Sequence, residues 1–170
     1  RLRLDPRRFL LAYAPKTERF VGWVLSVPCT KSELVSNKPW LYFAGLSVAR
    51  RKPKKAGQRK YRYLISLSAL PDAPIDTGRI LMEAVCEQGR RDGVCEIRYG
   101  VRGNGYASNK RKAETFPQYF IRVRKGEFKE PAYQMAINAG GRFLQLLPNY
   151  YADPDADNFG ILISHRLDRK

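Results

Sequence analysis

Short runs of β-branched and aromatic residues, separated by turn-forming residues, recur along the whole chain. Residues 1–27 alternate enough to predict extended structure, with apolar runs at 9–13 and 20–27 on either side of a turn. Pro28 is expected to end the second run, because proline has no backbone N–H to donate. Further strands are predicted at 61–68, 94–101, 118–125, 143–147 and 159–167. The apolar block 40–48 fits either a strand or a buried helix, since periodicity does not distinguish them at this length.

Two short helices are predicted between these strands. The first covers 79–88, where Asp76 or Thr77 can cap and Gly89 ends the helix, and its apolar stripe is formed by Ile80, Leu81, Ala84 and Val85. The second begins at Pro131 and is stopped by Gly140-Gly141. About seven strands and two short helices predict an α+β, β-dominated single domain over residues 1–170.

The charge balance narrows the possible partners. The chain carries 32 Lys and Arg against 16 Asp and Glu, a formal net charge of +16. Such an excess costs self-repulsion and is usually kept for a polyanion, whereas solubility needs only a net charge of ~2–8. No apolar run reaches the ~18 residues of a membrane-spanning helix, so an intracellular protein that does not enter a membrane is expected, with its compartment unassigned.

Few residues suit cofactor chemistry or nucleophilic catalysis. Three cysteines, far apart, do not form a disulfide framework, and a single histidine excludes most zinc sites and most His-based mechanisms. That histidine, His165, lies in a predicted strand, where a structural role is expected. No cofactor is therefore predicted.

The densest run of positive charge lies between residues 50 and 62. Eight basic residues fall in these thirteen positions with no acid among them: Arg50, Arg51, Lys52, Lys54, Lys55, Arg59, Lys60 and Arg62. Pro53 and Gly57 predict a loop, and Tyr61 and Tyr63 follow it directly. A basic loop beside aromatic rings suits phosphates with stacked bases, although a solvated face or a localisation signal would look similar.

A second basic group is predicted on a hairpin between residues 98 and 125. Its glycine-containing loop, which includes Tyr106, would let backbone N–H groups approach phosphate closely. The expected nucleic-acid contacts of this group, besides Tyr106, are Arg98, Arg102, Lys110, Arg111, Lys112, Arg122, Arg124 and Lys125. The alternative is a surface hairpin without a binding role.

Asp153, Asp155 and Asp157 place three carboxylates at alternate positions, as at the start of a calcium-binding loop. Ser164 stands where the closing Glu of such a loop belongs. An acidic turn is therefore expected, with a divalent cation, or a basic patch on a second copy of the chain, as the alternative ligand.

The segment Tyr42-Phe43-Ala44-Gly45-Leu46, followed by a basic loop, a strand and a helix, resembles the order of a LAGLIDADG homing endonuclease unit. That family needs an acidic metal ligand at the end of its signature helix. Here the matching positions read Ser47-Val48-Ala49-Arg50, so the resemblance does not include the catalytic carboxylate. Five residues do not assign the family.

These observations predict a non-enzymatic nucleic-acid-binding protein, with RNA or a single strand slightly favoured over duplex DNA. One alternative is a self-assembling viral capsid, nucleocapsid or ribosomal protein, which would form a homo-oligomer. Another is a metal-dependent nuclease that uses Glu83, Glu87, Glu96 or the Asp153–Asp157 cluster.

Overall fold

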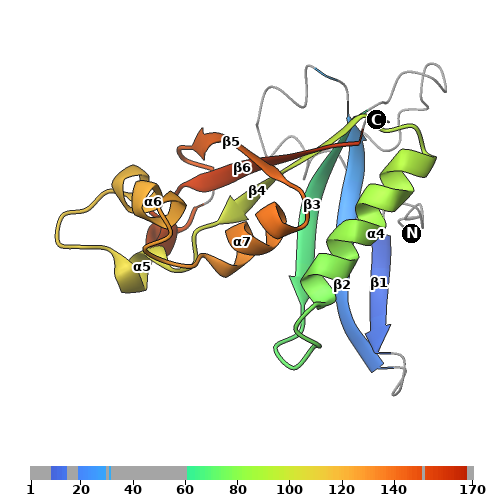
Figure 1. Cartoon of the computed structure of the whole chain (residues 1–170), viewed down its shortest axis with the longest axis horizontal. Coiled ribbons are helices and arrows are strands. Elements are labelled where there is room, and N and C mark those ends of the chain that lie inside the picture. The colour runs from blue at the N-terminus through green and yellow to red at the C-terminus, as the bar shows by residue number, and fades with distance from the viewer. Residues whose placement is uncertain (1–8, 15–18, 30, 32–60, 151, 168–170) are drawn as a thin grey trace. The chain divides into compact units, whose positions relative to one another are not determined.

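The computed structural model describes residues 9–14, 19–29, 31, 61–150 and 152–167 (Figure 1). Its strands are β1 (Phe9–Ala14), β2 (Arg19–Cys29), β3 (Tyr61–Ala69), β4 (Glu96–Arg102), β5 (Arg142–Leu147) and β6 (Gly160–Arg166). Its helices are α4 (Thr77–Arg91), α5 (Tyr106–Asn109), α6 (Phe116–Arg124) and α7 (Pro131–Asn138), with a 3-10 turn, η1, at Pro154–Ala156. The predicted α+β class is confirmed.

Hydrogen bonding orders the strands as β1-β2-β3-β4-β6-β5. The pairs β1/β2, β2/β3 and β5/β6 are antiparallel, whereas β3 and β4 are parallel. Because a parallel pair needs a long crossover, α4 connects β3 to β4. Pro28 does not end β2, which continues to Cys29 with Pro28 opposite Arg62.

The chain folds as two compact units. The first contains residues 1–99 and 165–170, and the second contains residues 100–164. The prediction of a single domain over 1–170 stays a prediction. Among the described residues no helix is long and apolar enough to cross a membrane.

In the first unit, α4 packs along one face of the strands β1, β2 and β3 (Figure 1). Its apolar stripe buries Leu81, Met82, Val85 and Cys86. Gly22 on β2 lets the helix approach, because a Cβ there would lie 2.6 Å from the backbone oxygen of Ser68 and 3.2 Å from Leu81 Cδ1. Gly89 has the same role near the other end of α4, where a Cβ would lie 2.7 Å from Leu167 Cδ1.

His165 belongs to the core of this unit. It is 4% exposed, its Nε2 atom lies 2.8 Å from the hydroxyl of Tyr99, and the two rings stack. Burial, together with the positive charge of Arg90, lowers the pKa of His165 to about 4. Burial also raises the pKa of Tyr99. The pair is therefore uncharged at neutral pH, in agreement with the expected structural role.

The second unit has an aromatic core in place of the predicted hairpin. Residues 118–125 were expected to form a strand, but residues 116–124 form the helix α6. Thr115 and Gln118 make a capping box, with the backbone N–H of Thr115 donating to Gln118 Oε1 at 2.9 Å. The buried residues Phe116, Tyr119, Phe120 and Val123 have helical spacing, so they form one stripe on α6.

The other predicted helices and strands are confirmed, although their first and last residues differ from the predicted ones. The first predicted helix is α4, the second is α7, and the strands predicted at 61–68, 94–101, 143–147 and 159–167 are β3, β4, β5 and β6. Gly140, in the predicted stop of α7, has a φ of 87°, a conformation that favours glycine. The apolar block 40–48 and the basic loop 50–60 lie outside the described residues.

Replacing Gly22 by Ala should destabilise the protein by about 1–3 kcal/mol, because the new methyl group meets backbone and a packed leucine. Urea unfolding measures this change. Leu11→Ala on the neighbouring strand, where the side chain is exposed, should cost less than about 1 kcal/mol. Equal losses for the two variants would contradict close packing at Gly22.

Stability should fall as the pH is lowered from about 6.5 to about 4. The unfolded His165 takes up a proton near pH 6.5, and the folded one only near pH 4, so acid favours the unfolded state. The contribution of His165 reaches up to about 3 kcal/mol by this linkage. Thermal unfolding of the wild type and of His165→Gln is compared from pH 7 to pH 4.5. Carboxylates titrate in both proteins, so the difference between the two pH profiles gives the contribution of His165. Parallel pH profiles would contradict a buried neutral His165.

Candidate functional site

The connection from β3 to α4 is a candidate anion-binding site in the first unit. The backbone N–H of Ala73 donates to the carbonyl of Leu70 at 3.0 Å, and that of Thr77 donates to the carbonyl of Pro74 at 2.9 Å. These bonds bring the chain from the carboxyl end of β3 directly into α4, with Asp76 as the N-cap. We call residues 70–79 the β3–α4 corner.

The parallel register of β3 and β4 is short. Tyr61, Arg62 and Tyr63 pair with Glu96, Ile97 and Arg98, and within the described strands the register ends there, although β3 continues to Ala69. The residues of β3 beyond Leu64 keep their pairing with β2. Carboxyl ends of parallel strands next to a helix N-terminus are a common place for ligands in α/β proteins.

The charges at the β3–α4 corner largely cancel. Asp72 pairs with Arg19, while Arg79 lies 3.6 Å from Asp76 and 2.6 Å from Glu83. The hydrogen bond with Glu83, and then that with Asp76, raises the pKa of Arg79, which stays charged. The first turn of α4 contains no acidic residue. The N–H groups of Thr77 and Ile80 are bonded to Pro74 and Asp76, so the backbone donors left among the described residues are those of Gly78 and Arg79.

The sequence-predicted contacts in the first unit do not gather at this corner. Arg50 to Lys60 lie outside the described residues. Tyr63 is 2% exposed, and Arg62 is buried in an ion pair with Asp92. Arg98 is held by Glu96, with 2.6 Å between Nε and Oε1. Tyr61 is partly exposed at the start of β3.

In the second unit, most of the predicted cations contact acids or aromatic rings. Arg102 holds Asp153, with Nη2 2.8 Å from Oδ1. Tyr106 is buried and donates to the backbone oxygen of Glu114 at 2.6 Å. Lys110 lies over the ring of Tyr106, and Arg124 over that of Phe143. Lys112 and Lys125 are exposed.

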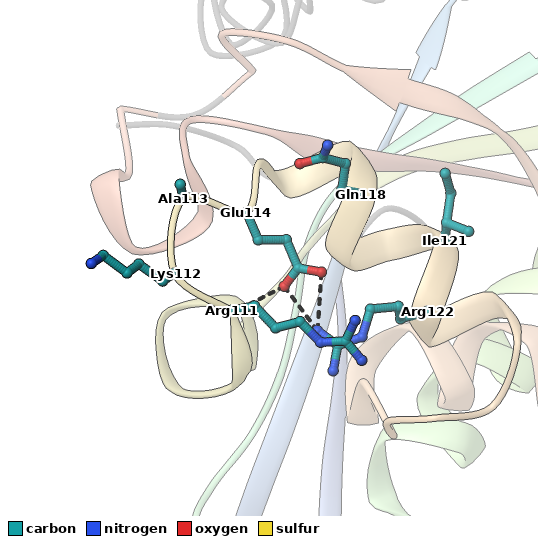
Figure 2. A pocket seen from close by; sticks show the side chains of 7 residues that line it. All are labelled: Arg111, Lys112, Ala113, Glu114, Gln118, Ile121 and Arg122. Carbon is teal, nitrogen blue, oxygen red and sulfur yellow. Dashed lines mark hydrogen bonds and ion pairs between the residues drawn. The ribbon is translucent and has the colours of Figure 1, made fainter.

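Arg111 and Arg122 meet at a shallow pocket of about 460 Å³ beside α6 (Figure 2). Arg122 Nη1 lies 2.9 Å from Glu114 Oε2, and its Nε donates to Glu127 at 2.8 Å. The backbone N–H of Arg111 also donates to Glu114, and this bond is the main cause that lowers the pKa of that carboxyl. The pocket was not foreseen, because it depends on α6 being a helix.

The acidic loop that contains Asp153, Asp155 and Asp157 is neutralised in part by Arg102. Arg102 pairs with Asp153 and lies 3.5 Å from Asp155, and the bond from Arg102 is the first cause that lowers the pKa of Asp153. Asp157 has a φ of 52° and accepts from the backbone N–H of Phe116. The described residues contain no cluster of three His, Cys, Asp or Glu that could hold a metal ion.

Glu130 is a buried acid that the sequence analysis did not select. It is 1% exposed, and its Oε1 accepts from the hydroxyl of Tyr119 at 2.7 Å and from the backbone N–H of Gly105 at 2.8 Å. Its Oε2 atom has no hydrogen-bond partner among the described residues. Glu130 is a single acidic residue before Pro131, and nothing in this local sequence indicates that its side chain is buried.

Cys86 is a buried free cysteine in the first unit, and its thiol is a possible nucleophile. Burial raises its pKa to about 11, so it stays a thiol at neutral pH. A thiol is a much weaker nucleophile than a thiolate. Cys86 therefore packs as a small apolar residue of α4.

Searches against family models and curated proteins gave no match. Solved structures do match. The GphF GNAT-like decarboxylase in complex with isobutyryl-CoA aligns with a TM-score of 0.76 at 22% identity, over 96% of this chain and 80% of that chain. The loading GNATL domain of CurA from Lyngbya majuscula aligns with a TM-score of 0.74 at 17% identity, over 96% and 78%. An aminoglycoside 6'-N-acetyltransferase complexed with coenzyme A aligns with a TM-score of 0.56 at 14% identity, over 98% and 76%.

These similarities correct the functional prediction. The fold is shared with decarboxylase and acetyltransferase enzymes, so the predicted non-enzymatic nucleic-acid-binding protein is wrong, as are the RNA preference and the nucleocapsid alternative. A LAGLIDADG-like nuclease unit is also excluded as the fold. The positive charge was assigned to the wrong kind of partner, because composition reports charge and not the geometry of a site. The chain has the GNAT fold.

Proposed function

We propose that this protein binds an acyl-CoA thioester and is an enzyme that acts on its acyl group. The observation that carries the proposal is the alignment of 96% of the chain with a GNAT-like decarboxylase in complex with isobutyryl-CoA. The crossover from β3 through α4 to the parallel strand β4 supports it, because this geometry offers backbone donors at a helix N-terminus.

The β3–α4 corner is the proposed place for the phosphates of coenzyme A. The N–H groups in the first turn of α4 are directed along the helix axis and Arg79 adds a guanidinium, which suits phosphate oxygens. Asp72 and Asp76 would oppose an anion if they were unpaired, but Arg19 and Arg79 contact them. The fit therefore relies on backbone donors more than on net charge.

The groups described in the first unit favour direct reaction of the bound thioester. Cys86 is protonated, so an acyl-cysteine intermediate on that residue is disfavoured. His165 is bonded to Tyr99 inside the core and is not available as a base at the surface. The TM-score of 0.76 for the GNAT-like decarboxylase exceeds the 0.50–0.56 of the acetyltransferases, which favours loss of CO2 from a carboxylated acyl-CoA over amine acetylation. In that reaction the C–C bond to the carboxylate breaks, CO2 leaves and the α-carbon takes a proton from water.

Acyl-CoA should raise the melting temperature of the protein. At a concentration of 100 times the Kd the stabilisation is about 2.7 kcal/mol, a shift of roughly 5–11 °C for a chain of 170 residues. Acetyl-CoA, isobutyryl-CoA and malonyl-CoA are compared by thermal unfolding, and products are identified by mass spectrometry. ATP at equal concentration is the control, because a charge of +16 attracts any polyanion. A shift with ATP as large as that with acyl-CoA would contradict a CoA site.

Replacing Arg79 by Gln should weaken acyl-CoA binding by about tenfold, the effect of losing one charge-assisted hydrogen bond. Arg91→Gln is a matched control, since Arg91 also lies on α4 and also pairs with a glutamate four residues away. Isothermal titration calorimetry with isobutyryl-CoA measures both. Equal weakening by both variants would indicate general electrostatic attraction in place of a site at the β3–α4 corner.

A further inference from the structure

The pocket beside α6 combines cations, an amide nitrogen that donates to no described residue and an apolar side chain. It is lined by Arg111, Lys112, Ala113, Glu114, Gln118, Ile121 and Arg122. Its charged side chains are three cations and one carboxylate, and its volume of about 460 Å³ lies within the usual range for small-molecule sites. It belongs entirely to the second unit and is independent of the β3–α4 corner.

The carboxylate of Glu114 does not offset the exposed cations. Its side chain is 8% exposed, and it receives two bonds from Arg122 Nη1 and one from the backbone N–H of Arg111. Figure 2 shows Glu114 directed toward Arg122, to the right of the loop that carries Lys112 and Ala113. Glu114 and Glu127 together hold Arg122 in place, and the ring of Phe128 lies 4.3 Å from its guanidinium carbon.

The remaining donors are turned outward. The Arg111 side chain is 69% exposed, and the only ion pair of its guanidinium within the described part of the chain is a long one, 3.6 Å from Glu127. Lys112 is exposed and, within the described residues, has no ion pair. Gln118 uses its Oε1 atom to accept from Thr115, and no described residue accepts from its amide nitrogen.

Ile121 gives the pocket an apolar wall. It is 55% exposed on α6 and lines the same pocket as Arg122. A large apolar side chain beside outward-facing cations matches a ligand that has both an anionic head and an apolar body. A bare inorganic ion would leave Ile121 in water.

We propose that this pocket binds a small organic anion, with a carboxylate or phosphate head group on Arg111, Lys112 and Gln118 and an apolar body against Ile121. The guanidinium of Arg111 can hold either head group through two parallel hydrogen bonds. The rigid Arg122–Glu114 pair positions the Arg111 backbone and so prepares the site before the ligand binds.

Calorimetry with phenyl phosphate, benzoate and inorganic phosphate, at about 150 mM salt, tests the proposal. The double variant Arg111→Gln/Lys112→Gln should weaken binding of the organic anions by tenfold or more, since it removes both mobile cations. The control Lys125→Gln/Lys129→Gln removes the same charge from exposed positions outside the pocket and should change the Kd by less than about twofold.

Ile121→Ser separates the apolar contact from the charge. It should weaken phenyl phosphate by about three- to tenfold and leave inorganic phosphate unchanged, because only the former buries apolar surface. Phenyl phosphate and benzoate carry the same ring, so stronger binding of phenyl phosphate would identify phosphate as the preferred head group, and the reverse would identify carboxylate. Equal losses in the two double variants, or phenyl phosphate binding no tighter than inorganic phosphate, would overturn the proposal.

Discussion

The close packing of α4 on the sheet is the constraint on which the first unit depends. Two glycines set it, because a Cβ at Gly22 would meet the backbone of Ser68 and one at Gly89 would meet Leu167. The helix then buries Leu81, Met82 and Val85 against β2 and β3. Its first turn is thereby fixed at the carboxyl end of β3, and the proposed phosphate contacts require that position.

Many of the arginines that make the chain basic form ion pairs within the protein. In the described part of the chain, Arg62, Arg98, Arg102 and Arg122 each contact at least one carboxylate. Such pairs hold loops and helix ends together, and they occupy part of the hydrogen-bonding capacity of each guanidinium. The net charge of +16 still attracts anions over a distance, but the cations left exposed decide where an anion can bind.

The second unit is stabilised differently from the first. Aromatic rings of α6 stack and tilt against one another and against Phe159 and Phe143, with Glu130 buried beside Tyr119. The hydroxyl of Tyr106 donates to the backbone oxygen of Glu114, and that of Tyr119 donates to the carboxylate of Glu130. This core holds α6 rigid, so the pocket on its outer side has a fixed wall and a fixed guanidinium.

The sequence alone determined the elements with strong local signals. Pro131 and Gly140 marked α7, and the β-branched runs marked β3 and β6, because caps and periodicity act over a few residues. The prediction that Gly89 ends the first helix was wrong, because α4 continues to Arg91 and Gly89 is buried within it. The segment 118–125 was misread, since its alternating apolar residues fit a strand as well as a helix until Thr115 and Gln118 are seen to cap it.

Only the tertiary structure decided the sites. The parallel pairing of β3 with β4 joins residues more than thirty positions apart, and no local pattern encodes which strands become neighbours. The pocket needs Arg111 and Arg122 on separate segments around Glu114, and the core pair needs Tyr99 beside His165. Composition gave the sign of the charge correctly but not its partner, because a binding site is defined by the arrangement of groups in space and not by their number.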